Sequence, residues 1–288
     1  MIKFMVQKQK NISIFTFVLL ISQAIFADVT KTAPAVSTTT TAAPKIETEK
    51  EKPFTLTTAI EYSEKIAVDE RSERERGTDI NLSATYKINS LYTLLTKASI
   101  TKDLMGPQDT TFSDTTVGAI VKGVQINPSL ITTHSISAIL PTSDVSQKRD
   151  RLRTSIGVSN GISYSNDYIQ AKYSLGISKN FHEFSQNAEG TALSEYKISN
   201  TIDLVVPFTE KFSISATGIY RTSFTYDKDQ KYGFGFYGDL NYDLTQNLSA
   251  NVGISTEGSA LKSNGVDSNI SVYDQNSTIT RLGITYVY

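Results

Sequence analysis

Residues 280–288 read Thr-Arg-Leu-Gly-Ile-Thr-Tyr-Val-Tyr and end the printed sequence. Leu282, Ile284, Tyr286 and Tyr288 alternate with less apolar residues, and successive side chains of a strand point to opposite sides. The pattern therefore predicts a strand with one apolar face and one mixed face. The value of this pattern as evidence for a fold depends on whether the rest of the sequence repeats it.

The same alternation recurs from residue 54 onward. Most segments are about nine to fourteen residues long, which is enough for a tilted strand to cross a bilayer. The alternation predicts twelve strands, at 54–62, 80–88, 92–101, 114–126, 130–140, 151–164, 169–177, 195–204, 212–224, 232–242, 248–255 and 280–288.

The connections between these segments are alternately short and long. The short connections include Asn89-Ser90, 127–129 and 165–167, whereas the long ones include 64–78 and 258–275. Short turns on one side and long loops on the other are typical of membrane β-barrels. A soluble β-sandwich and a β-propeller are the alternatives, but their strands are usually shorter.

An apolar closing strand with an aromatic C-terminus resembles the last strand of Gram-negative outer-membrane β-barrels. The resemblance implies an all-β fold, a closed antiparallel up-and-down transmembrane β-barrel of about twelve strands. It also implies contact with outer-membrane lipid, and recognition of the C-terminal strand by the barrel-assembly machinery.

The N-terminal region has a different composition from the rest of the chain. Residues 1–27 combine lysines, an apolar run of about ten residues and a small residue at Ala27, which predicts a cleavable signal peptide. A membrane anchor is the alternative, although the run is short for one. Residues 28–52 are rich in Thr, Ala and Pro and then in Lys and Glu, which predicts a disordered periplasmic linker or a partner-binding arm. The barrel is expected over 53–288.

The composition narrows the chemistry. The net charge of −1 gives no reason to expect a nucleic-acid partner, and the absence of Cys removes thiolate metal sites and thiol nucleophiles. His134 and His182 are the two histidines. His134 does not have the His-x-Ser spacing of phospholipase-type barrels, and His182 lies in a predicted loop, where one Glu beside it is a weak protease-like signal. We expect no catalytic, metal or cofactor site, and the face on which His134 lies is left open.

The mixed face of the strands carries the candidate pore residues. It is rich in Ser, Thr, Gly and Asn. Side chains fill the interior of an eight-stranded barrel, and barrels of sixteen or more strands hold an aqueous channel, so a twelve-stranded barrel has a lumen of intermediate width. Lys97 and Arg281 lie near mid-height, where no inward acid is expected, so these cations predict a mild preference for anions. The alternative is that the cations pair with acids of the wall. The cationic lumen candidates are Lys97, Lys122, Arg151, Arg153, Lys172, Arg221 and Arg281.

The sequence thus predicts a narrow passive diffusion channel for small polar or anionic solutes. Residues 138–144, Ala-Ile-Leu-Pro-Thr-Ser-Asp, resemble a strand-end motif of the phenol-degradation MetA-pathway barrel class, with Ser143 in place of Gly. In that class uptake of hydrophobic compounds is proposed. The alternative is a structural or surface-interaction barrel with a blocked lumen and partner-binding outer loops.

Overall fold

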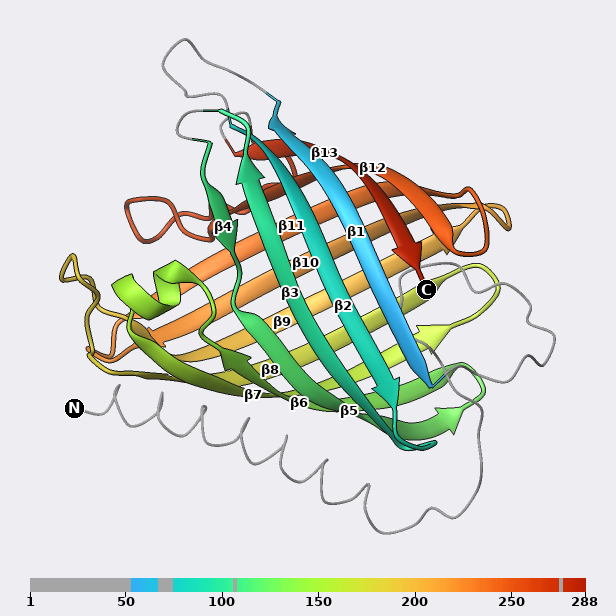
Figure 1. Ribbon diagram of the computed structural model, residues 1–288, viewed down its shortest axis with the longest axis horizontal. Helices are drawn as coiled ribbons and strands as arrows, with labels where there is room; N and C mark the ends of the chain where they lie inside the picture. Colours follow the sequence, from blue (N-terminus) through green and yellow to red (C-terminus); the bar gives the residue numbers. More distant parts are fainter. Residues whose placement is uncertain (1–52, 67–74, 106–107, 275–276) are drawn as a thin grey trace. The chain divides into compact units, whose positions relative to one another are not determined.

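The structure is a computed structural model that describes residues 53–66, 75–105, 108–274 and 277–288 (Figure 1). The signal peptide and linker expected over 1–52 lie outside these residues. No helix among the described residues is long and apolar enough to cross a membrane. The strands are β1 (Phe54–Lys65), β2 (Arg76–Lys87), β3 (Tyr92–Asp103), β4 (Thr110–Phe112), β5 (Thr115–Asn127), β6 (Leu130–Leu140), β7 (Leu152–Ser165), β8 (Gln170–His182), β9 (Ser194–Pro207), β10 (Phe212–Thr225), β11 (Gln230–Asp243), β12 (Leu248–Ser259) and β13 (Thr278–Val287).

These strands form one antiparallel sheet that closes on itself. Each long strand pairs with its neighbours in the sequence, and β13 pairs with β1 from Thr57↔Val287 to Lys65↔Ile279. The backbones of Leu56 and Tyr288 also bond to each other in both directions, at 3.3 and 2.8 Å. The closing strand therefore has no free edge, as the C-terminal pattern predicts. The predicted closed antiparallel barrel of twelve long strands is confirmed.

The two faces of the wall follow the alternation in the sequence. Apolar side chains at alternate positions are exposed on the outside; in the closing strand, for example, Leu282 is 59% and Ile284 is 52% exposed. Tyrosines exposed near the short turns form the belt typical of a membrane interface; they are Tyr86, Tyr92, Tyr164, Tyr242, Tyr286 and Tyr288.

The short turns lie at one end of the barrel and the long loops at the other, which we call the short-turn end and the long-loop end. Asparagine side chains fix two of the short turns. Asn89 Oδ1 accepts from the backbone N–H groups of Leu91 and Tyr92, and Asn166 Oδ1 accepts from those of Tyr168 and Ile169. These Asx turns reverse the chain within a few residues, as the sequence predicts.

The wall departs from simple alternation in three places. The fourth predicted strand is β5, but a short extra strand, β4, precedes it; both pair with β3, and Ser113 and Asp114 separate them. β8 continues to His182, so this residue ends a strand and does not lie in the loop predicted for it. The loop after β6 contains the helical turn η1 (Val145–Arg149). Alternation of apolar and polar residues does not predict these features, because they depend on the local path of the backbone.

Candidate functional site: the lumen

The inner face of the barrel borders two cavities whose lining residues are mostly polar. One, of about 370 Å³, is lined by residues that include Thr57, Ser83 and Lys97. The other, of about 230 Å³, is lined by residues that include Glu61 and Asp239. Ala59 and Asn81 line both cavities, so the two spaces meet along β1 and β2. The lumen therefore contains solvent-sized space along this part of its wall.

Arg281 joins three strands within the lumen. Its guanidinium lies 3.3 Å from Glu61 Oε2 on β1 and 2.7 Å from Asp239 Oδ1 on β11. The side chains of Arg281, Glu61 and Asp239 are only 14%, 20% and 18% exposed. Such a low exposure reduces solvent screening, so the two carboxylates neutralise the arginine effectively.

Two glycines leave the room that this cluster needs. Gly253 on β12 lies directly between Asp239 and Arg281 in the register of the sheet. A Cβ at Gly253 would lie 2.0 Å from Asp239 Oδ1 and 2.4 Å from the carbonyl oxygen of Gly238. In the next row Gly283 separates Glu61 from Asn251, whose Oδ1 would lie 2.5 Å from a Cβ at Gly283. Neighbouring side chains can therefore meet along the inner face, over a residue that has no side chain of its own.

Tyr237 is an aromatic residue of the lumen that the sequence analysis did not single out. The Cζ atom of Arg281 lies 5.1 Å from the centre of the Tyr237 ring, which is cation–π distance. Tyr237 is two residues before Asp239 on β11, so the two side chains share a face. Its odd number was the available signal, since the odd-numbered residues of β11, Asp239 among them, lie on the lumen face.

The structure corrects the expectation that no inward acid lies near the mid-barrel cations. Glu61 and Asp239 both pair with Arg281, and Asp79 lies directly opposite Glu61 on β2. Arg281 is therefore not the mid-barrel cation without neighbouring acids that the sequence predicted. The physical reason is the register of the sheet: Glu61 and Asp239 are far from Arg281 in sequence, but strand pairing brings them within one or two strands of it.

Lys97 has a different environment. It is an exposed residue of β3 and lines the larger cavity together with Asp114. Its register partners are Ser83 and Thr116, which are uncharged. Within the described part of the chain, no ion pair holds Lys97.

Three other candidates lie on long strands of the wall. Lys122 lies opposite Thr133 on β6, and Lys172 lies opposite Asp203 on β9. Arg221 Nη1 lies 3.5 Å from Glu257 Oε2, diagonally across β11, where Arg221 is paired with Gly233 and Glu257 with Gly235. Both side chains of this pair are more than a third exposed, so the pair contributes little to stability.

Arg151 and Arg153 do not fit the uninterrupted strand predicted over 151–164. Arg151 precedes β7 and has a left-handed φ of 48°. Leu152 pairs with His182 and Thr154 with Phe181, so Arg153 is the extra residue of a β-bulge. The strict alternation from which the lumen position of both arginines was predicted is therefore interrupted at the start of β7.

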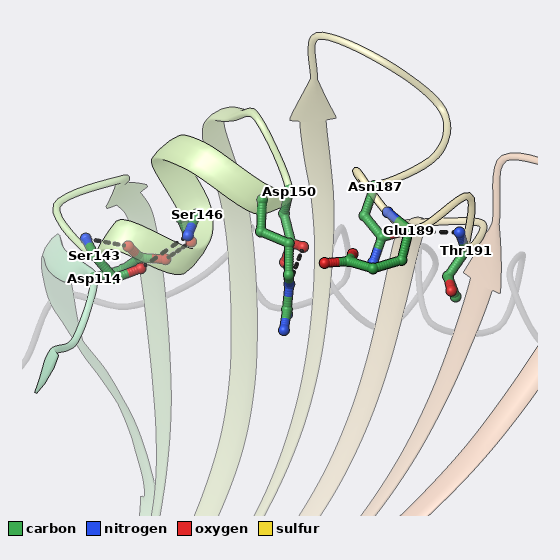
Figure 2. A network of polar contacts seen from close by, with 8 residues as sticks. Asp114, Ser143, Ser146, Asp150, Asn187, Glu189 and Thr191 are labelled. Carbon is green, nitrogen blue, oxygen red and sulfur yellow. Dashed lines mark hydrogen bonds and ion pairs between the residues drawn. The ribbon is translucent and has the colours of Figure 1, made fainter. Parts of the chain in front are cut away.

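Hydrogen bonds at the long-loop end hold η1 against the link between β4 and β5 (Figure 2). Asp114 accepts from the backbone N–H of Ser143 at 3.0 Å and from the Ser146 hydroxyl at 2.5 Å. Asp114 also lines the larger cavity, so this network lies at the edge of the lumen.

Outside the strands, Asp150 accepts a hydrogen bond from Arg149 and raises the pKa of that arginine.

The two histidines lie apart on different faces. His134 shares the apolar outer face with Ile136, which settles the question that the sequence left open. His182 ends β8 and makes an edge-to-face contact with Tyr226 at 5.7 Å. Among the described residues no group of three or more His, Cys, Asp and Glu side chains has the arrangement of a metal site.

Comparisons with known proteins reveal likeness in structure alone. No protein-family model matches the chain, and no curated protein matches its sequence. The COG4313 outer membrane channel from Pseudomonas putida F1 superposes with a TM-score of 0.56 at 8% identity, covering 82% of this chain and 95% of the channel. The NanC porin superposes with a TM-score of 0.49 at 10% identity, covering 80% of this chain and 98% of the porin. The chain therefore has the fold of a porin-like outer-membrane barrel.

Proposed function

We propose that the protein is a narrow passive diffusion channel for small polar solutes in the outer membrane. The observation that carries the proposal is the contrast between the two faces of one closed wall. The outer face is apolar and exposed, whereas the inner face borders cavities of about 370 and 230 Å³ whose lining residues are mostly polar, two of them shared. A barrel with these faces separates lipid from a hydrated path.

The proposed selectivity for charge is weak. Inward cations and acids are mixed, and Arg281 is held by two carboxylates. Anion preference is therefore not part of the proposal. Neutral and zwitterionic solutes of small size fit a lumen that has charges of both signs and many hydroxyl groups.

In this proposal the short-turn end and the N-terminal segment face the periplasm, and the long loops face outward. The even number of long strands puts both ends of the barrel segment at the same side. The C-terminal strand would then be the part that the assembly machinery reads, through Leu282, Ile284, Tyr286 and Tyr288.

Conductance in planar lipid bilayers tests the channel directly. The purified, folded protein should produce discrete current steps that scale with salt concentration. The heat-denatured protein is the matched control and should produce none. A folded protein that inserts without conducting would contradict the channel and support a barrel whose lumen is blocked.

A further inference from the structure

A row of polar side chains crosses the apolar outer face of the barrel. His134 on β6 lies opposite Asn160 on β7, Asn160 opposite Leu175 on β8, and Leu175 opposite Asn200 on β9. We call His134, Asn160 and Asn200 the outer polar row. Two amides and an imidazole thus fall on a single register row.

The outer polar row lies within the apolar band of the wall. Asn160 is flanked along its strand by Val158 and Ile162, which are 49% and 37% exposed. Asn200 is flanked by Ile198 and by Ile202, which is 52% exposed. Charged and amide side chains elsewhere on the outer face of the described strands lie near strand ends, as Glu64 and Arg76 do. The row is therefore exceptional in its position.

Contacts within the barrel satisfy only part of the row. His134 Nδ1 donates to Asn160 Oδ1 at 2.6 Å, and its Nε2 is 3.5 Å from the Thr132 hydroxyl. The Tyr173 hydroxyl donates to Asn200 Oδ1 at 2.7 Å. Among the described residues, the side-chain amide nitrogens of Asn160 and Asn200 have no acceptor. Lipid tails provide no hydrogen-bond acceptor, so both N–H donors would lose hydrogen bonds in hydrocarbon.

We infer that the outer polar row is the centre of an interface with a second copy of this chain. An asparagine amide carries both a donor and an acceptor and can pair with a symmetry-related amide. A twofold contact brings the same patch of both copies together, so one row satisfies the other. Polar contacts of this kind hold membrane-embedded segments together. The interface joins the faces formed by β6 to β9.

Leu175 provides the probe for this interface because it lies between Asn160 and Asn200 in the row. The protein has no Cys, so a single introduced cysteine reports one position. Leu175→Cys should give a covalent dimer with a short bismaleimide in native membranes. Val252→Cys, on β12, is the matched control, since Val252 is an outward apolar residue that is 50% exposed. It should remain monomeric.

A second variant tests the role of the amides. Asn160→Leu with Asn200→Leu, in the Leu175→Cys background, should lower the dimer yield about tenfold, because two polar contacts within a membrane are lost. The fold should persist, since leucine suits a lipid-facing position; a mobility shift on boiling in SDS checks this. Equal cross-linking at Leu175→Cys and Val252→Cys, no cross-linking at either, or an unchanged yield in the double leucine variant would overturn the interface. Cross-linking to a protein of different mass would overturn the second copy as the occupant.

Discussion

Arg281 and Lys97 are both inward-facing cations of the barrel wall, but their surroundings differ. Arg281 is 14% exposed and is held by carboxylates from two other strands, whereas Lys97 is exposed and has serine and threonine as register partners. A position on the inner face therefore does not determine the electrostatic effect of a charge. Its effect depends on which residues the register brings within reach, and on whether a glycine leaves them room.

The largest effect is expected from the removal of the held cation. Arg281→Gln leaves Glu61 and Asp239 without their partner in a poorly exposed site. We expect the free energy of unfolding to fall by about 3 kcal/mol, because loss of one partner leaves uncompensated buried charge. The reversal potential in a salt gradient should also shift towards cations. Urea unfolding and bilayer recordings measure the two effects, and a variant as stable as the parent would contradict the ion-pair cluster.

The glycine that separates Asp239 from Arg281 gives the next largest effect. Gly253→Ala adds a Cβ into space that the Asp239 carboxylate occupies. We expect destabilisation of about 1–3 kcal/mol from this overpacking. Gly218→Ala is the matched control, because a Cβ at Gly218 meets no atom within 4 Å. Urea unfolding should separate the two variants; equal stabilities would show that Gly253 is not needed.

The smallest effect is expected at Lys97. Lys97→Gln removes an exposed charge without leaving a partner behind, so stability should stay within about 0.5 kcal/mol of the parent. The reversal potential should still move slightly towards cations, since Lys97 lines the larger cavity. A loss of stability as large as that of Arg281→Gln would show that the two cations are held alike.

This difference between the two cations also shows what the sequence could and could not predict. Period-two alternation was enough for the barrel, the strand count and the outward face of Leu282 and Ile284, because side chains alternate strictly within a regular strand. It failed at Arg153, where a single extra residue breaks the alternation. Bulges carry no strong sequence signal of their own.

The charge cluster was out of reach for another reason. Glu61 and Arg281 are separated by almost the whole barrel sequence, and only closure of the sheet makes their strands neighbours. Asp239 reaches Arg281 across a further strand, which requires a glycine at position 253 in the same row. Sequence spacing does not report such rows, since they depend on register across several strands.

The reversal potential of Glu61→Gln with Asp239→Asn tests most directly whether Arg281 is neutralised by its two acids. Each amide keeps the size of the carboxylate and one acceptor oxygen, replaces the other oxygen by an NH2 donor, and removes the negative charge. We predict a reversal potential near zero for the parent in a salt gradient, and a clear shift towards anions in the double variant. A parent that is already strongly anion-selective, or a double variant that matches the parent, would contradict the neutralised arginine.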